Sequence, residues 1–137
     1  MTRAEIGKMG EDAVCRYLEE RGYTIRDRNF RIRGGEIDIV AQKDDFLCIV
    51  EVKTRKLDAV ESGMEAVTRS KMKRLIRACY IYCEKRGIGE HDYNFRYDIA
   101  DVSYWNGHIT DIDYLESAFD ESDHICDEIF GNDHYSW

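Results

Sequence analysis

The chain has 137 residues, of which 43% are hydrophobic, and a formal net charge of −8. This length and composition suit one compact domain with a single core. The sequence has no apolar run of about 18 residues, which excludes a transmembrane helix, and its charged N-terminus argues against a signal peptide. We therefore predict a soluble, cytoplasmic protein with no membrane partner.

The five cysteines are odd in number and scattered through segments with core-forming patterns. Free, buried thiols are therefore expected instead of disulfides. No pair of them has a C-x-x-C spacing, so a structural zinc site is not expected. The five positions are Cys15, Cys48, Cys79, Cys83 and Cys126.

The negative charge is concentrated at the C-terminus. Residues 120–137 contain six acidic residues and no Lys or Arg, which leaves 22 acidic and 20 basic residues in 1–119. A nearly neutral body with local basic patches is compatible with phosphate binding, which depends on the local field. We predict one domain over residues 1–119 and an acidic extension over 120–137.

The first helix is predicted from its capping residues. Thr2 with Glu5 three residues later forms a capping-box pattern, and Gly22 supplies the stop. Between them an apolar stripe recurs at helical spacing, and Glu11 lies at its edge. Residues 23–33 then read as a strand running into a basic loop, which Gly34-Gly35 ends.

Residues 36–41 and 46–54 are the strongest strands. Both are apolar on both faces, with Ile37 and Ile39 on one face of the first strand and Val40 on the other. Strands of this kind are central strands that helices cover on both sides. Residues 56–66 read as a loop.

The second half of the domain is predicted as a helix followed by a hairpin. An apolar stripe over residues 68–86 indicates a helix that Gly87 ends. Residues 95–104 alternate as a strand, and Asn106-Gly107 is a strong turn signal before a return strand at 109–114. The strand–helix–strand connection should be a right-handed parallel crossover, which gives a mixed sheet.

Counting residues around the central hairpin predicts which side chains face each other. A turn at Asp44-Asp45, or one over residues 43–46, pairs residues whose numbers sum to 89. Asp38 would then face Glu51, and Glu36 would face Lys53, on one side of the sheet. A three-residue loop would break this register.

Two opposed carboxylates repel each other unless a proton or a cation lies between them. Mg²⁺ favours one or two carboxylates together with waters and phosphate oxygens. Lys53 projects on the same face as Glu51, where its ammonium could orient a water or stabilise charge on a phosphorane-like transition state. These residues suit phosphodiester hydrolysis.

Several stretches of the chain resemble a known family. Asp38 followed by Glu51-Val52-Lys53 matches the D…(D/E)-x-K signature of the restriction-endonuclease-like, PD-(D/E)xK nuclease superfamily, although Ile37 stands where that signature often has proline. Within it, the chain is similar to the uncharacterised YraN-like family over roughly residues 1–119. The supporting stretches are GKMGEDAVCRYLEERGY (7–23), RNFRIRGGEIDIV (28–40), FLCIVEVKTR (46–55), residues 71–78, RYDIADV (96–102) and YLESAF (114–119).

The resemblance implies a fold and a site. The fold would be an α/β restriction-endonuclease-like three-layer core, with a mixed sheet of about five strands flanked by two main helices. Asp38 and Glu51 would be ligands of Mg²⁺ or Mn²⁺, and Lys53 would be the catalytic lysine. Glu11 matches a first-helix acid that some relatives, notably Holliday-junction resolvases, place near the metal. We therefore expect a metal-dependent nuclease, with DNA favoured as the substrate and branched or processing intermediates among the candidates.

Each assignment has a structural alternative. The three central charges could form an exposed cross-strand ion-pair ladder, although apolar neighbours on the same face disfavour this. For Glu36, pairing with Lys53 or a basic neighbour is favoured over metal ligation, and Asp98 beside Arg96 reads as a structural partner. Solvated surface is the alternative for the basic residues that could bind nucleic acid, which are Arg28, Arg31, Arg33, Arg55 and Lys71.

Two other functions are compatible with the pattern. One is a catalytically inactive nucleic-acid-binding module of the same fold. The other is an assembly role, for which the acidic extension is the sole hint. Cleavage of both strands of a duplex would favour a homodimer.

Overall fold

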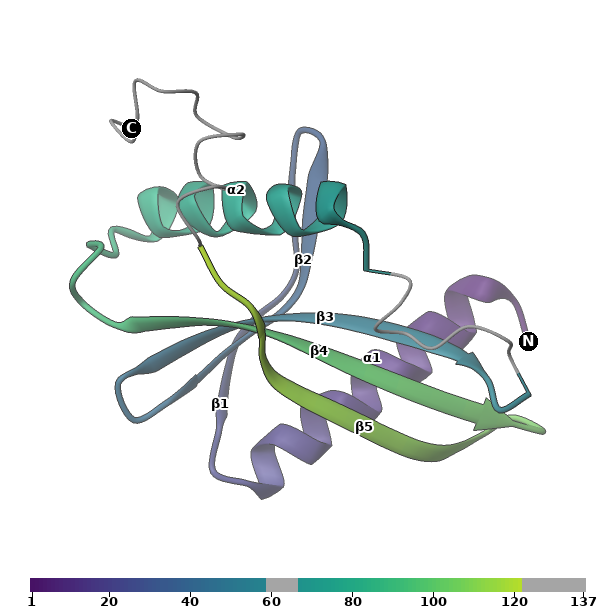
Figure 1. Cartoon of the computed structure of the whole chain (residues 1–137). Helices are drawn as coiled ribbons and strands as arrows, with labels where there is room; N and C mark the ends of the chain where they lie inside the picture. The colour runs from purple at the N-terminus through teal and green to yellow at the C-terminus, as the bar shows by residue number, and fades with distance from the viewer. Residues whose placement is uncertain (59–66, 122–137) are drawn as a thin grey trace.

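The computed structural model describes residues 1–58 and 67–121 of the chain. Helix α1 is followed by a β-hairpin and a third strand, then by helix α2 and a final hairpin (Figure 1). The predicted loop at 56–66 lies mostly outside the described residues, as does the acidic extension after Glu121. The elements are α1 (Arg3–Glu20), β1 (Thr24–Ile32), β2 (Gly35–Lys43), β3 (Phe46–Lys56), α2 (Arg69–Arg86), β4 (Asn94–Trp105) and β5 (His108–Phe119).

The five strands form one sheet in the order β1-β2-β3-β4-β5. Strands β3 and β4 are parallel, and the other neighbours are antiparallel. One helix covers each face of the sheet, as Figure 1 shows. The predicted α/β fold, with a mixed five-stranded sheet between two helices, is confirmed.

The helix ends are set by the predicted residues. The Thr2 hydroxyl accepts a hydrogen bond from the Glu5 backbone, and the Glu5 carboxylate accepts one from the Thr2 backbone, which completes the capping box. Helix α2 begins after Thr68, whose side chain caps Lys71, and ends at Gly87 in the left-handed conformation. Satisfying these terminal backbone groups locally defines where each helix begins and ends.

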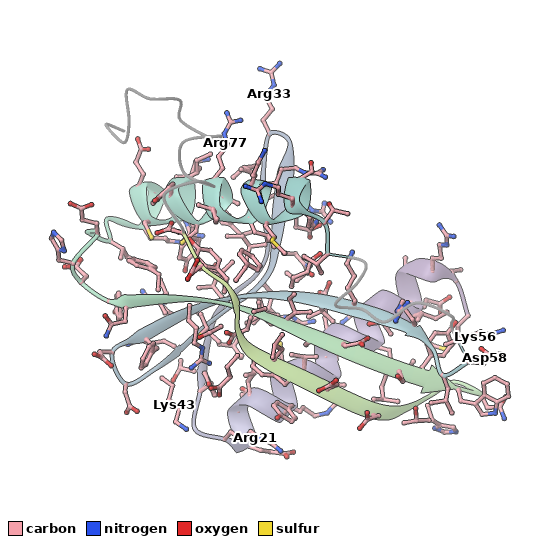
Figure 2. The ribbon with its side chains drawn as sticks, in the orientation of Figure 1. Arg21, Arg33, Lys43, Lys56, Asp58 and Arg77 are labelled. Carbon is pink, nitrogen blue, oxygen red and sulfur yellow. The ribbon has the colours of Figure 1, made fainter. Side chains whose placement is uncertain are left out.

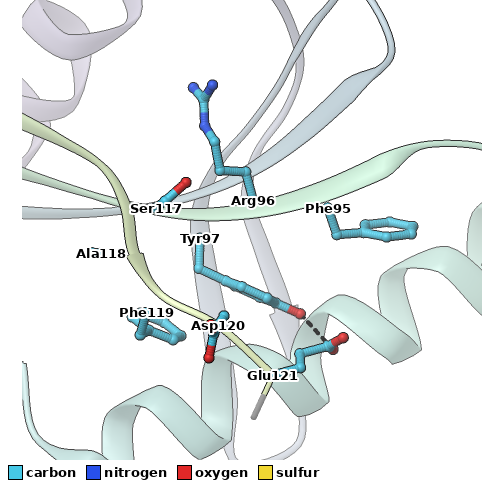
Figure 3. Close-up of a pocket in the computed structure, with 8 residues that line it drawn as sticks. All are labelled: Phe95, Arg96, Tyr97, Ser117, Ala118, Phe119, Asp120 and Glu121. Carbon is cyan, nitrogen blue, oxygen red and sulfur yellow. Dashed lines mark hydrogen bonds between the residues drawn. The ribbon is translucent and has the colours of Figure 1, made fainter.

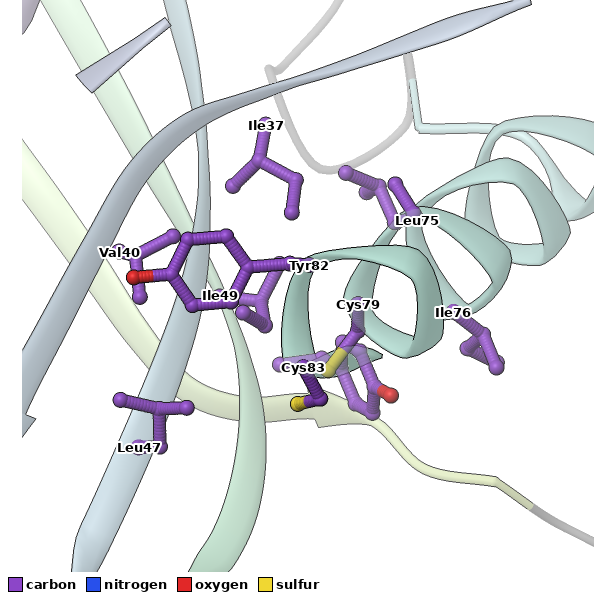
Figure 4. Close-up of a cluster of buried hydrophobic side chains, with 11 residues drawn as sticks. Ile37, Val40, Leu47, Ile49, Leu75, Ile76, Cys79, Tyr82 and Cys83 are labelled. Atoms are coloured by element: carbon purple, nitrogen blue, oxygen red, sulfur yellow. The ribbon is translucent and has the colours of Figure 1, made fainter. Parts of the chain in front are cut away.

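The core consists of two layers, one on each face of the sheet. Leu75, Ile76 and Tyr82 of α2 pack on Leu47 and Ile49 of β3 (Figure 4). On the other face, the α1 side chains contact alternate residues of the same strands, which are Ile39, Ala41, Cys48 and Val50. The predicted two-sided burial of β2 and β3 is therefore correct.

From Ile39 to Ala41 the side chains of β2 alternate between the two faces of the sheet, as predicted. Ile37 was expected on the other face from Val40, but both side chains belong to the cluster under α2. The tip of the β1–β2 hairpin turns away from β3 and runs past α2, as Figure 1 shows. Strict alternation fails at this bend because the strand changes its direction relative to the sheet.

Four of the five cysteines are free and buried, as predicted, and Cys126 lies outside the described residues. None of the helices within 1–58 and 67–121 is long and apolar enough to cross a membrane.

Two glycines of α1 should respond oppositely to alanine. A Cβ on Gly7 meets no atom within 4 Å, whereas one on Gly10 would lie 1.9 Å from Oγ1 of Thr54 in β3. We expect Gly7→Ala to stabilise the fold by about 0.5–1 kcal/mol, because alanine loses less entropy in a helix. Gly10→Ala should destabilise it by about 1–3 kcal/mol through overpacking.

Urea unfolding followed by far-ultraviolet circular dichroism measures both free energies. Wild-type stability of the Gly10→Ala variant would contradict the close approach of α1 to β3. A loss of stability in Gly7→Ala would contradict the open space at that position.

Candidate active site

The β2–β3 hairpin has the predicted turn and register. Its turn is Asp44-Asp45, with Asp44 at a φ of 54°. Cα partners run from Lys43–Phe46 to Ile39–Val50, and each pair sums to 89 as the count required.

The ladder ends at Ile39–Val50, one pair before the two carboxylates. Beyond this point β2 stays paired with β1 while β3 continues beside β4. The Asp38 carboxylate occupies the position where the strands separate, and its Oδ2 accepts a hydrogen bond from the Val52 backbone N–H at 2.8 Å. The gap between β2 and β3 is therefore spanned by a side chain instead of backbone pairing.

The predicted facing of Glu36 and Lys53 is wrong. Glu36 lies opposite Arg31 in the β1–β2 ladder, and their charged groups are 3.6 Å apart. Lys53 Nζ lies instead 3.4 Å from Oε2 of Glu51. The separation of the strands removed the cross-strand neighbour that the count assumed. The basic neighbour expected as the alternative partner of Glu36 is thus Arg31.

Glu51 is almost completely buried, with 2% of its surface exposed. One of its oxygens, Oε2, lies 3.4 Å from Lys53 Nζ and 3.4 Å from Lys71 Nζ, which reaches it from the first turn of α2. The other oxygen, Oε1, is buried without a hydrogen-bond partner among the described residues. A buried carboxylate oxygen without a partner is costly, so this atom calls for a proton or a cation.

The Asp38 carboxyl lies beside Glu51. Burial, the negative charge of Glu51 and a hydrogen bond to Glu51 together raise the pKa of Asp38 to about 8, against the Val52 N–H, which lowers it. Glu11 adds a smaller repulsion in the same direction. The Asp38 carboxyl therefore keeps its proton near neutral pH.

A divalent cation fits this pair of carboxyls. It would replace the proton of Asp38, and it would satisfy Oε1 of Glu51, which has no hydrogen-bond partner within the described residues. Residues 1–58 and 67–121 contain no group of three or more metal-ligating His, Cys, Asp or Glu side chains. Mg²⁺ commonly uses only one or two carboxylates and completes its shell with waters and phosphate oxygens. The donor set thus matches Mg²⁺ or Mn²⁺ better than a metal that needs a full protein cage.

Glu11 is linked to the hairpin through a residue that the pattern did not single out. Asn29 Nδ2 donates to Glu11 Oε1 at 2.9 Å and to Glu36 Oε1 at 3.1 Å. Asn29 has a φ of 51°, a conformation that asparagine tolerates better than most residues. The one sequence feature that could have pointed to Asn29 is an asparagine within a run of strand-forming and basic residues. The amide thus joins the two accessory acids, Glu11 of α1 and Glu36 of β2.

Four of the five predicted nucleic-acid-binding residues make ion pairs within the chain. Arg28 lies 2.7 Å from Asp12 and 3.8 Å from Glu11, and Arg55 lies 3.9 Å from Asp101. Lys71 belongs to the carboxylate site. Arg31 and Arg33 lie near the β1–β2 tip, where Arg33 projects outward (Figure 2).

Asp98 has the structural role that its place beside Arg96 suggested. It is 1% exposed and accepts hydrogen bonds from the Arg96 guanidinium, the Tyr114 hydroxyl and the Ser117 backbone. Because its oxygens are well supplied with donors, it is a satisfied core carboxylate.

A pocket at the end of β5 contains none of the predicted site residues. Figure 3 shows its lining, in which the Tyr97 hydroxyl donates to the Glu121 carboxylate at 2.9 Å. This pocket is therefore separate from the site that was predicted from the sequence.

The family model of the uncharacterised protein family UPF0102 matches residues 10–102, which include Asp38, Glu51, Lys53 and Lys71. The chain belongs to this family. A UPF0102 protein of Bacteroides thetaiotaomicron is 44% identical over 115 residues, covering 84% of this chain and 92% of its own length. One from Dictyoglomus thermophilum is 39% identical over 122 residues, covering 87% of this chain and all of its own length.

Membership of UPF0102 confirms the resemblance to the YraN-like family. A third relative, the UPF0102 protein of Alkaliphilus metalliredigens, is 38% identical over 114 residues, which are 83% of this chain and 96% of that protein. These relatives carry only the family name, which states no activity.

Proposed function

We propose that this UPF0102 protein is a metal-dependent nuclease that hydrolyses phosphodiester bonds in nucleic acid, with DNA as the favoured substrate. The observation that carries the proposal is the buried Glu51 beside Asp38, with two lysines near one of its oxygens and no hydrogen-bond partner for the other within residues 1–58 and 67–121. A structural ion pair gains nothing from a second buried acid beside Glu51. A site for a divalent cation does, because both carboxylates can bind the metal.

Each residue has a separate task in this proposal. Asp38 and Glu51 hold Mg²⁺ or Mn²⁺, which when bound supplies Lewis acidity and lowers the pKa of water. Lys53 and Lys71 balance the charge of the carboxylates. With Glu51 bound to a cation, the ammonium groups of Lys53 and Lys71 would be available to bind a phosphate oxygen or to orient the attacking water.

The surroundings of the site favour a polyanionic substrate. Lysines approach Glu51 from both β3 and α2, and Arg55 follows on the same strand. A nucleic-acid backbone is recognised mainly through such contacts to its phosphates. A small uncharged substrate would gain little from them.

A cleavage assay tests the proposal. Single-stranded, duplex and four-way-branched DNA, with the corresponding RNA, are incubated with protein in Mg²⁺ or Mn²⁺ and in EDTA. We expect metal-dependent cleavage of at least one substrate, and a loss of about 10³-fold in Glu51→Gln, because the amide is a far weaker metal ligand than a carboxylate. Lys71→Ala should lose about 10²-fold, since removing one donor at a charged transition state costs that much.

The matched control is Asp44→Asn. It makes an acid-to-amide change on the same hairpin, and asparagine suits the positive φ of that turn residue. Wild-type activity in the control and loss in Glu51→Gln locate the reaction. Absence of cleavage with every substrate and both metals, with salt-sensitive binding retained, would replace the proposal by the inactive nucleic-acid-binding module.

A further inference from the structure

A pocket of about 430 Å³ lies between the first turns of α1 and the C-terminal end of β3. Arg3 and Gly7 line it from α1, and Arg55 and Lys56 line it from β3. None of the sequence patterns predicted it, because its walls come from segments about 50 residues apart. Its volume is in the range of pockets that bind small ligands or one segment of a larger one.

The lining carries an excess of positive charge. It contains the cationic side chains of Arg3, Arg55 and Lys56, against the single carboxylate of Glu11, while Asp101 lies outside the lining at 3.9 Å from Arg55. The Glu5 carboxylate already caps the N-terminal end of α1, so the cationic side chains alone supply the positive excess. An anion is therefore the favoured occupant.

Two lining residues have polar atoms without partners. Oγ1 of Thr54 and Nε of Arg55 are buried and make no hydrogen bond within the described part of the chain. Both atoms can donate. A buried donor left without a partner costs free energy. Oγ1 of Thr54 packs against Gly10 of α1, so an oxyanion in the pocket satisfies these donors only when their side chains turn toward it.

The pocket borders the carboxylate pair. Val52 lines it, and the backbone N–H of Val52 donates to Asp38 at 2.8 Å. Glu11 also lines it, and the charge of Glu11 acts on the Asp38 carboxyl. An anion in the pocket would thus be held beside the place proposed for the reacting phosphate.

We propose that this pocket binds a backbone phosphate of a nucleic-acid strand, next to the phosphate at Asp38 and Glu51. The identity of the ligand rests on the proposed function, while the subsite itself does not depend on cleavage. Its task is to position the strand: Arg3, Arg55 and Lys56 bind a phosphate that does not react, and this contact sets which phosphodiester faces Asp38.

The test measures binding without chemistry. A 12-nucleotide single-stranded DNA with a 5′-fluorescein is titrated by fluorescence anisotropy in EDTA, with every variant made in an Asp38→Asn background. Removing both exposed cations with Arg3→Ala and Lys56→Ala should weaken binding about tenfold. The slope of log affinity against log salt concentration should also become shallower, by about 0.7 for each phosphate that the protein no longer neutralises.

The matched control removes two cations elsewhere. Arg16 is an exposed residue of α1 outside the pocket. Lys43 ends β2 beside Phe46, at the start of β3, whereas Lys56 ends β3 (Figure 2). Arg16→Ala with Lys43→Ala changes the net charge equally and should alter affinity less than twofold. An equal loss in both double variants would overturn the subsite, because it would show that only total charge matters.

Gly7 allows a second test at constant charge. Its position is open, so Gly7→Leu would place a side chain in the pocket without disturbing the core, and Gly7→Ala adds helix propensity with little volume. We expect Gly7→Leu to weaken binding at least fivefold and Gly7→Ala to leave it within twofold, with both melting temperatures at or above that of the background. Unchanged affinity in a folded Gly7→Leu variant would overturn the proposal.

Competition separates the sources of the phosphate. Unlabelled oligonucleotide should displace the probe at concentrations at least 100-fold below those of inorganic phosphate. If inorganic phosphate competes equally well, the pocket binds the free ion and the strand proposal is overturned. None of these measurements requires cleavage. If the protein cleaves nothing but the variants lose binding as expected, the subsite is supported and only the nuclease proposal fails.

Discussion

Asp38→Asn is expected to lower metal-dependent cleavage by about 10³-fold or more and, at the same time, to make the metal-free protein more stable. The loss of activity follows from replacing a metal-ligating carboxylate by an amide. The gain in stability follows from burial, because the wild-type carboxyl ionises in a site that already contains Glu51. A residue whose neutralisation harms function but helps folding is a functional residue.

The gain should depend on pH with a definite sign. The pKa of Asp38 is raised from 3.8 to about 8 in the folded protein, so the folded state binds more protons than the unfolded state between these values. Wild-type stability therefore falls as the pH rises from about 4 to about 8, whereas the amide does not titrate. We expect Asp38→Asn to exceed the wild type by about 1–3 kcal/mol at pH 8.5 and by much less at pH 4.5.

Chemical denaturation in EDTA at the two pH values measures this difference, and the cleavage assay measures the activity. Asp44→Asn, on the same hairpin but exposed, serves as the control and should show neither effect. A destabilised Asp38→Asn protein would mean that the carboxylate makes a net favourable ion pair. Asp38, at the point where β2 and β3 separate, would then stabilise the fold and would not mark a functional site.

The second large effect concerns metal binding by the wild-type protein. Because a cation and a proton compete for the same carboxyl pair, binding Mg²⁺ or Mn²⁺ should release one proton below pH 8. The apparent Kd should therefore weaken about tenfold for each pH unit below 8 and level off above it. Added metal should raise the melting temperature most strongly at pH 8.5, which reverses the metal-free trend.

Isothermal titration at pH 6.5, 7.5 and 8.5, in two buffers of different ionisation enthalpy, measures the affinity and the released proton. Glu51→Gln is the control for binding elsewhere on this acidic chain and should show only weak, pH-independent binding. The same affinity for the wild type at pH 6.5 and 8.5 would contradict a metal held between Asp38 and Glu51.

Local patterns predicted much of the fold because the interactions that produce them are local. The Thr2–Glu5 capping box and the left-handed Gly87 satisfy backbone groups within a few residues of themselves. The Asp44-Asp45 turn determined the register of β2 and β3, since pairing follows from the turn and side chains alternate with period two. From that register, Asp38 and Glu51 were expected to be neighbours.

The same count failed where non-local contacts take over. It placed Glu36 opposite Lys53, but the β1–β2 hairpin leaves β3 after Ile39 and Glu36 pairs with Arg31. The bend places Ile37 under α2, in the same cluster as Val40. No pattern within β2 reports this, because burial against a helix that lies later in the chain favours the bend.

The hairpin with Asp38, Glu51 and Lys53 was thus determined by the sequence itself, through one turn and the alternation of two strands. The tertiary structure alone decided that the strands separate at the carboxylates, that Lys71 reaches Glu51 from α2, and that Arg3 and Lys56 share a pocket. The physical reason is the range of the interactions along the chain. Caps and turns are set by neighbours along the chain, whereas a site that holds charges out of water needs side chains that only the packed layers bring together.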